Sequence, residues 1–448
     1  MASEAQKTLL KLIIDYNQTR EDHSEVGMYR ELIEYLKLGR RRQWSASRRS
    51  DRQNRLFRKV VRRAYEDVPL YRSKLLSYQI TPDSITSIDD LTQLPVFRKS
   101  DFNESPLENR VSRNADYTRM ETVATSGSTG VPLQIGFSSS EGARRRACLL
   151  RTFVDLGAPF MHKRLVVKTD LRPTQPSFTR ALLRFNLKSC SPEKACGLYV
   201  KYRPDVISGL PTVLHIFALE AKTKGVGEFR PQLVVPSGEM LFPDTERLLR
   251  ETFQAPVRPY YGCWEFGVVA AWCDQAAGYH LVTDNIVVEC LKDGKAVKDQ
   301  ERGELTLTGL TSWEMPFIRY STGDLAEVGW DPCECGRLGP TIRNLYGRED
   351  DFLVLRDGRL IPPVLAIKPL FDLLSLRQYR VIQEGFENYR IEYAGIRDLT
   401  NDEQTRIKAY FSSVLGASEV DFQSYPELPS EASGKLRKVI SRVIWKDN

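Results

Sequence analysis

The sequence contains no run of apolar residues that approaches the ~20 needed to span a bilayer, so we expect no transmembrane helix. The first residues also lack the features of a secretory signal, because Leu9–Ile14 is a short apolar stretch without a basic region before it or a cleavage site after it. We therefore expect a cytoplasmic protein. Cysteine is sparse, with 8 in 448 residues, and in that compartment cysteines are thiols or metal ligands rather than disulfides.

Neither internal repeats nor low-complexity tracts occur in the sequence. Apolar residues make up 41% of the chain, enough for a packed core, and 448 residues favour two or more domains or one large domain with a cap. The net charge is +7, and basic residues are concentrated between Arg40 and Arg63. Such a stretch can bind nucleic acid or an anionic membrane, but no nucleic-acid motif accompanies it. We interpret it as a solvated helix face.

One stretch stands out by its density of hydroxyl groups and glycines: Thr125, Ser126, Gly127, Ser128, Thr129 and Gly130, followed by Val-Pro. Glycines let a backbone bend through positive φ, and hydroxyls with free N–H groups can surround an anion, so such a loop can hold a polyphosphate. It is not the lysine-containing P-loop, because no Gly-Lys-Ser/Thr follows. Taken alone, the same composition also fits a solvated surface loop.

Four later stretches favour the phosphate-binding interpretation: Tyr260–Glu265, Arg319–Asp324, Gly347–Asp351 and Ser433–Lys435. Together and in this order, the motifs resemble those of the adenylate-forming ligases, which include acyl-CoA synthetases, adenylation domains and luciferases. The resemblance spans about residues 120 to 440. Three further features are similar to the phenylacetate-CoA ligase and CapK-like branch: YGCWEFG at 261–267, Cys-x-Cys-Gly-Arg at 333–337 and Val-Pro-Leu-Tyr-Arg at 68–72.

The resemblance implies an α/β adenylate-forming ligase fold in three parts. These are a helical entry segment at residues 1–115, a large α/β body at 116–349 and a small, mobile α+β C-terminal domain at 350–448, hinged near Asp350. Residue patterns agree with it: helical spacing before residue 78, alternating strands and helices from 133 to 239, and an Asp-Gly hairpin after residue 352. The alternation predicts parallel sheets with sites at the carboxyl ends of the strands.

For the nucleotide, the resemblance implies a set of binding residues at matching positions. The run at 125–130, with Thr129 as a direct ligand, would cradle the β- and γ-phosphates of ATP. Tyr261 would stack on adenine, and Asp324 would accept hydrogen bonds from both ribose hydroxyls. Arg348 would donate to the ribose or to a phosphate. The other predicted contacts are Ser237, Gly238 and Glu239, along the adenine edge, and Tyr260 and Gly262, which flank Tyr261.

For catalysis, the resemblance implies Thr129, Glu265 and Lys435. Attaching AMP to a carboxylate requires in-line attack on the α-phosphorus, in which positioning and charge neutralisation do most of the work. Glu265 would hold Mg²⁺, and Lys435, after a flexible glycine, would neutralise charge in the transition state. Trp264 departs from the pattern, because the superfamily usually has Thr or Ser there to bind the α-phosphate and an indole offers a single N–H donor.

A zinc site is predicted independently of ATP. Cys333 and Cys335 form a tight pair, while Cys273 and His280 lie seven residues apart in one loop shortly after Glu265. Three thiols and one imidazole make a closed tetrahedral set, of the kind that holds structural Zn²⁺. The two pairs meet only if their loops pack together, and unrelated buried thiols are the alternative. The resemblance supports the site, because some CapK-like relatives show this arrangement.

The predicted function is ATP-dependent activation of a carboxylic acid as an acyl-adenylate, with release of pyrophosphate and transfer of the acyl group to a thiol such as CoA. Two alternatives stay open: an amine or hydroxyl acceptor in place of the thiol, and a non-catalytic protein that binds nucleotide within a biosynthetic complex. Candidate pocket residues are mostly apolar or aromatic, which favours a flat aromatic acid. The oligomeric state, including a dimer, is not indicated by the sequence.

Overall fold

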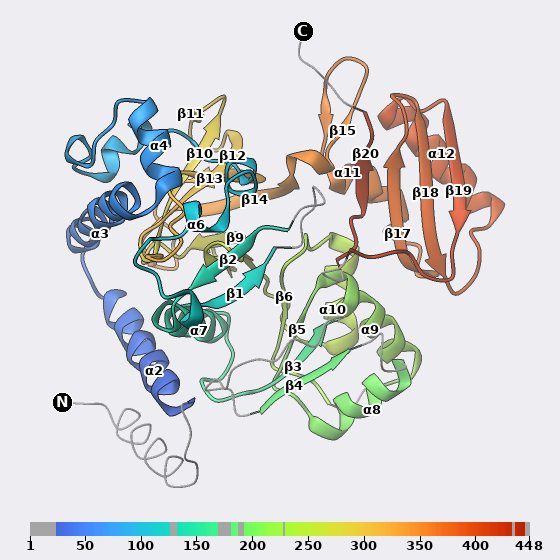
Figure 1. Ribbon diagram of the computed structural model, residues 1–448. Helices are drawn as coiled ribbons and strands as arrows, with labels where there is room; N and C mark the ends of the chain where they lie inside the picture. Colours follow the sequence, from blue (N-terminus) through green and yellow to red (C-terminus); the bar gives the residue numbers. More distant parts are fainter. Residues whose placement is uncertain are drawn as a thin grey trace.

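The computed structural model describes residues 24–125, 132–168, 181–186, 192–226, 229–431 and 435–443 (Figure 1). Figure 1 shows helices α2 to α4 on one side, a body built on two large sheets in the middle, and a smaller α+β part with its own sheet on the other side. Among the helices in these ranges, none combines the length and the hydropathy of a membrane span.

The expected helical entry segment is present from residue 24 on, whereas Leu9–Ile14 lies outside the described residues. Its elements are α2 (Ser24–Arg41), α3 (Ala46–Asp67), α4 (Pro69–Ser77), α5 (Lys99–Asn103) and α6 (Leu107–Arg110), with 3₁₀ turns at Pro82–Ser84, Ile88–Gln93 and Tyr117–Arg119. The Ser45 side chain caps α3, and its apolar face of Phe57, Val60, Val61 and Ala64 is buried at helical spacing. Pro69 begins α4, where its missing N–H costs nothing.

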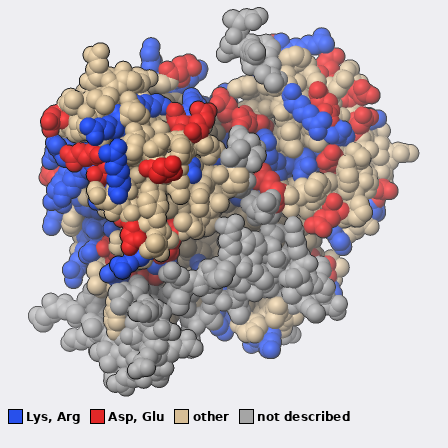
Figure 2. Space-filling view, viewed as in Figure 1, with Lys and Arg blue, Asp and Glu red and all other residues tan. Residues whose placement is uncertain are grey.

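Several residues of the basic stretch in this segment form ion pairs or hydrogen bonds while remaining exposed. The guanidinium of Arg42 pairs with Asp155 on α7 (Ser139–Asp155), and that of Arg62 pairs with Asp83. Arg58 donates to the carbonyl of Thr86 at 2.9 Å. In Figure 2, Lys and Arg are densest at the left edge, over the α3 and α4 region, and acidic side chains lie among them. These contacts agree with the interpretation as a charged helix face rather than a nucleic-acid surface.

The predicted parallel sheet forms in the first half of the body. It consists of β3 (Lys163–Lys168), β4 (Ala181–Asn186), β5 (Val206–Gly209) and β6 (Leu233–Pro236), in the order β4-β3-β5-β6 with every pair parallel. The helices that accompany it are α8 (Pro192–Tyr202), α9 (Pro211–Thr223) and α10 (Pro243–Phe253). All residues of β5 and β6 are buried, as expected for strands covered on both faces.

The second large sheet corrects the expectation of parallel sheets. Its eight strands run in the order β11-β10-β12-β13-β14-β9-β8-β7, and every neighbouring pair is antiparallel. They are β7 (Tyr260–Cys263), β8 (Gly267–Cys273), β9 (Gly278–Leu281), β10 (Ile286–Lys292), β11 (Lys295–Ala296), β12 (Arg302–Gly309), β13 (Tyr320–Gly329) and β14 (Thr341–Arg348). No helix separates these strands, so short connections return the chain antiparallel.

After Arg348 the chain forms the smaller α+β part. It contains a 3₁₀ turn at Glu349–Asp351, β15 (Leu353–Val354), β16 (Leu360–Ile361), α11 (Pro363–Ile367), a 3₁₀ turn at Lys368–Leu370, β17 (Leu376–Gln383), β18 (Asn388–Gly395), α12 (Asn401–Leu415), β19 (Glu419–Ser424) and β20 (Val439–Ser441). The Asp-Gly hairpin predicted after residue 352 is confirmed by the pairing of β15 with β16. A separate core that includes Val381, Ile391 and Phe411 supports a domain boundary near Asp350, which stays a prediction.

Candidate active site

The predicted phosphate loop joins two strands of a small hairpin. Strands β1 (Glu121–Ala124) and β2 (Gln134–Phe137) pair antiparallel, with Ala124 opposite Gln134. Thr125 closes the base of the connection: its N–H donates to the Leu133 carbonyl at 3.0 Å, and its hydroxyl accepts from the Leu133 N–H at 2.9 Å. Ser126, Gly127, Ser128, Thr129 and Gly130 lie outside the described residues, so the phosphate contacts stay a prediction.

The turn between β7 and β8 presents Glu265, the predicted magnesium ligand. The Glu265 side chain is only 6% exposed, and its Oε1 accepts a hydrogen bond from the Tyr320 hydroxyl at 3.0 Å. Gly262 is required for this turn, because an added Cβ would lie 2.5 Å from the carbonyl oxygen of Gly267. The carboxylate is therefore positioned by the hydrogen bond from Tyr320 and by a turn in which the backbones of Gly262 and Gly267 lie close together.

Arg145 on α7 holds the same turn from the other side. Its guanidinium donates to the backbone carbonyls of Trp264 and Glu265, at 2.6 and 2.8 Å, and to the buried carboxylate of Glu141 at 2.8 Å. The Trp264 side chain is 46% exposed. Neither Arg145 nor Tyr320 was predicted as a site residue. The basic run 144–146 and the aromatic residue inside Arg319–Asp324 were the available signals.

Asp324 and Arg348 lie on the neighbouring strands β13 and β14, and the side chain of Tyr261 reaches Asp324 from β7. Asp324 on β13 lies opposite Arg348 on β14, and the Tyr261 hydroxyl donates to Asp324 Oδ2 at 2.5 Å. Burial, together with Asp324, raises the pKa of Tyr261 well above its usual value, so the phenol stays protonated and donates. Burial opposes the charge on Arg348, but Asp324 and nearby acids raise its pKa on balance. The predicted ribose-binding pair is thus adjacent and charged.

The Ser237–Gly238–Glu239 turn follows β6 at the carboxyl end of the parallel sheet. The Ser237 N–H donates to the Gly209 carbonyl at 3.0 Å, and Gly238 has φ of 87°, which favours glycine. Glu239 was expected along the adenine edge. Its carboxylate accepts from the Thr212 N–H and, across to the C-terminal part, from the Leu436 N–H, each at 3.0 Å. Lys435, half-buried, therefore lies next to a residue anchored on the body.

Lys99 is a further cation of this region that the sequence did not predict. It begins α5, directly after the segment in which Phe97 pairs with Tyr320. Burial lowers the pKa of Lys99, Arg348 adds to this, and Glu265 opposes it. The Lys99 ammonium is therefore close enough to Arg348 and Glu265 for their charges to change its pKa.

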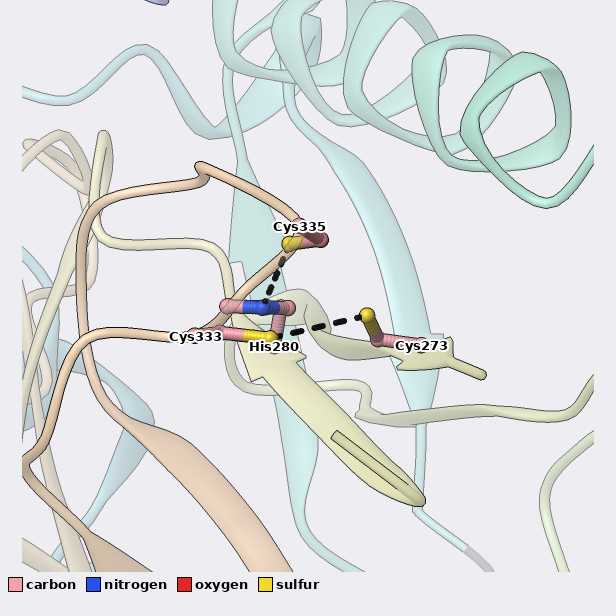
Figure 3. A group of neighbouring side chains, drawn as sticks. All are labelled: Cys273, His280, Cys333 and Cys335. Carbon is pink, nitrogen blue, oxygen red and sulfur yellow. Dashed lines mark hydrogen bonds between the residues drawn. The ribbon is translucent and has the colours of Figure 1, made fainter. Parts of the chain in front are cut away.

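The four predicted zinc ligands lie together, and their side chains point toward one another (Figure 3). Cys273 ends β8 and His280 lies on β9, while Cys333 and Cys335 belong to the loop between β13 and β14. The loops meet because β14 pairs with β9, with Thr341 opposite His280. All four ligating atoms lie within 4.8 Å of one another.

The spacing of the ligand atoms and the neutral state of His280 suit a tetrahedral ion, whereas Cys335 would have to lose its proton on binding. Cys273 Sγ and Cys333 Sγ are 4.0 Å apart, and Cys335 Sγ and His280 Nε2 are 3.1 Å apart. Zn–S bonds of about 2.3 Å imply S···S edges of about 3.8 Å. Burial, with two nearby arginines, lowers the pKa of His280 to about 4, which keeps the imidazole neutral as a ligand. Burial raises the pKa of Cys335 to about 11.

Comparisons with known proteins agree with this geometry, although no protein-family model matches the chain. The chain is 25% identical to the phenylacetate-coenzyme A ligase of Thermus thermophilus over 337 residues. The matched region covers 69% of this chain and 72% of that ligase. It is 20% identical over 451 residues to protein CapK of Staphylococcus aureus, covering 97% and 95%. The solved structure of 2-hydroxyisobutyryl-CoA ligase in its postadenylation state matches with a TM-score of 0.75 and 19% identity, over 90% of this chain and 91% of that one.

The architecture is that of the adenylate-forming ligases, as the motifs predicted. In sequence, the chain is similar to phenylacetate-coenzyme A ligases and to protein CapK. The same 2-hydroxyisobutyryl-CoA ligase in its thioesterification state gives a TM-score of only 0.63. Because both values come from one relative, the difference reflects how its parts are placed. The structure described here is therefore more similar to the postadenylation structure of that ligase than to its thioesterification structure.

Proposed function

We propose that this protein joins a carboxylic acid to AMP, releasing pyrophosphate, and then transfers the acyl group from the adenylate to the thiol of CoA. The observation that carries the proposal is the convergence of Glu265, Asp324 and Arg348 from separate elements, with Asp324 opposite Arg348 and Glu265 near enough to help raise the pKa of Arg348. The ligases to which the chain is similar supply independent support, since their names state CoA ligase activity.

Each of these residues has a distinct part in the proposed reaction. Asp324 would bind the ribose hydroxyls, with Arg348 beside it to donate to the ribose or a phosphate. Glu265 suits Mg²⁺, because it is a buried carboxylate with one oxygen already oriented by Tyr320. Bound Mg²⁺ would neutralise phosphate charge. Lys435 would stabilise charge that develops between the attacking carboxylate and the α-phosphate, which is where a fixed cation contributes most.

The acid and the acceptor are the finer parts of the proposal. An aromatic acid is favoured by the similarity to ligases named for phenylacetate. CoA is favoured as acceptor by the same names. An amine or a hydroxyl acceptor is the alternative, and similarity to CapK over nearly the whole chain keeps it open.

We further propose that Cys273, His280, Cys333 and Cys335 hold one structural Zn²⁺. The support is the donor set and the spacing of the ligating atoms. The ion would join the β8–β9 hairpin to the β13–β14 loop.

The proposed adenylation is tested by exchange of labelled pyrophosphate into ATP with a panel of carboxylic acids that includes phenylacetate. Exchange that depends on one acid supports the proposal, and its loss in Asp324→Ala links it to this site. Asp331→Ala is a control, since Asp331 is an exposed acid in the loop that follows β13 and its carboxylate pairs with Arg343. Silence of the wild-type protein with all acids, combined with tight ATP binding, would favour the non-catalytic nucleotide-binding alternative.

A further inference from the structure

The three residues that follow Lys435 each form a hydrogen bond that holds this segment against the rest of the protein. The Leu436 N–H donates to Glu239 on the body at 3.0 Å. The Arg437 guanidinium donates to Asp351, next to the predicted hinge, at 2.8 Å. Lys438 is 9% exposed, and its ammonium donates to the Tyr379 hydroxyl at 2.8 Å. In Figure 1 this segment, in dark red, extends from β20 toward α10.

The contact made by Lys438 crosses from the C-terminal part to the body. Asp244 lies in the first turn of α10, is 5% exposed, and accepts a hydrogen bond from the Tyr379 hydroxyl at 2.7 Å. The Lys438 ammonium lies 3.7 Å from the same Asp244 oxygen, and 4.1 Å from the centre of the Tyr379 ring. Phe242, also on the body, covers the ammonium at 5.1 Å. A cation and a carboxylate from opposite sides are thus buried against each other.

A second ion pair crosses the same boundary and provides a contrast. Arg247 on α10 donates to Asp372 at 2.8 Å, but their side chains are 53% and 85% exposed. Exposed pairs contribute little to stability, whereas removing one partner of a buried pair leaves an uncompensated charge in the interior. The Asp244–Lys438 contact therefore decides how well the two parts stay together.

We propose that Asp244, Tyr379 and Lys438 act as positioning residues, an interdomain clamp that holds Lys435 at the adenylation site and opens before acyl transfer. The inference rests on the proposed function for the role of Lys435. Lys438 follows Lys435 by three residues, so fixing its ammonium on α10 restricts where Lys435 can reach. When the C-terminal part rotates away, both charged groups regain water, and opening leaves neither of them buried and unpaired.

This reasoning makes the clamp specific to one arrangement. In Asp244→Asn, the closed arrangement buries the Lys438 charge without the carboxylate that lies 3.7 Å from it, whereas the open arrangement is unaffected. In Lys438→Met, the closed arrangement buries the Asp244 carboxylate without the ammonium that neutralises it, and the open arrangement is again unaffected. The double variant Asp244→Asn/Lys438→Met buries no charge, so closure should recover. If the two substitutions instead caused independent packing defects, the losses of closure in the single variants would add up in the double variant.

The first measurement needs no ligand: hydrogen exchange followed by mass spectrometry on the full chain. Peptides from residues 240–250 and 374–382 should exchange at least about tenfold faster in each single variant than in the wild type. The double variant should return toward the wild-type rate, Asp372→Asn should leave it unchanged, and peptides from α12 should not respond in any variant. An unprotected wild-type boundary, or an Asp372→Asn effect as large as that of Asp244→Asn, would overturn the clamp.

The second measurement separates the half-reactions, with phenylacetate or whichever acid of the panel supports exchange. Adenylate formation should slow at least tenfold in each single variant, while thioester formation from the preformed acyl-adenylate and CoA should keep its wild-type rate. Equal losses in both half-reactions would reject a role in positioning Lys435. If no acid supports exchange in the wild type, the proposed function fails, and the exchange of the boundary peptides decides the clamp by itself.

Discussion

Replacing Arg145 with methionine tests whether the turn that carries Glu265, the proposed magnesium ligand, depends on a residue outside it. The Arg145 guanidinium is the donor to two successive carbonyls, those of Trp264 and Glu265, and it neutralises the buried Glu141. Glu141 is 3% exposed and also accepts from the Ser312 hydroxyl at 2.8 Å. Methionine keeps most of the length and apolar volume of the side chain but none of the donors.

The magnitude follows from what the substitution leaves behind. Burial already raises the pKa of Glu141, and Arg145 is the first influence that opposes this. Breaking a buried ion pair by removing one partner costs about 3–5 kcal/mol. At about 2–4 °C per kcal/mol for a unit of 150–250 residues, a loss of about 3 kcal/mol corresponds to a fall in Tm of about 6–12 °C. Glu141→Gln/Arg145→Met should recover about half of this fall, since no charge is then stranded.

The function of the turn should not recover in the double variant, because the two carbonyls still lack their donor. We expect Arg145→Met and the double variant to need a higher Mg²⁺ concentration for half-maximal pyrophosphate exchange, by about tenfold. Thermal unfolding by calorimetry and a Mg²⁺ titration of the exchange reaction measure the two effects separately. If the Tm of Arg145→Met lay within about 2 °C of the wild type, the expected cost of leaving Glu141 buried without its partner would be wrong. If the Mg²⁺ requirement were unchanged, Arg145 would not position the Glu265 turn.

Four further substitutions test other parts of the molecule. Lys435→Ala should slow adenylate formation by at least about 10²-fold with ATP affinity nearly intact, since its charge acts on the transition state; stopped-flow measurement at the wild-type rate would exclude it. Asp350→Pro, which restricts φ to near −65°, should impair one half-reaction more than the other, and equal wild-type rates for both would place the hinge elsewhere. Cys335→Ser should release the single zinc expected per chain and lower Tm, whereas wild-type protein purified without chelator and free of zinc by elemental analysis would reject the site. Burial raises the pKa of Glu31 from 4.5 to about 7, so the folded state binds more protons in that window and stability falls as pH rises through it; Glu31→Gln should flatten the dependence of the denaturation midpoint between pH 5 and pH 8.

Local patterns in the sequence were sufficient wherever the structure depends on neighbouring residues. The Asp357-Gly358 turn predicted a hairpin, and β15 pairs with β16 on either side of it. The α12 helix starts and ends where its capping residues indicate, with Thr400 and Glu403 forming a capping box and Gly416 in the left-handed conformation. Turns and caps satisfy backbone groups within a few residues, so their signals are local.

Chemically distinctive residues were also predictable when their type restricts what they can bind. Three cysteines and a histidine were predicted to meet across two loops, and the pairing of β9 with β14 brings them together. Asp324 and Arg348 were each predicted from a motif, and they prove to be opposite one another on adjacent strands. The antiparallel direction of that sheet was not predicted, because single-strand patterns carry no information about the direction of the partner.

The sequence by itself therefore determined the class of fold, the turns and caps, and the residue types at the site. The tertiary structure alone decided which residues support them. Arg145 reaches the carbonyl of Glu265 across 120 positions, and Lys438 reaches Tyr379 across 59. No spacing rule connects such residues, because their contacts depend on how sheets and helices pack rather than on local backbone geometry. The support for Glu265 and Lys435 is set by buried charges that pair only after the chain has folded.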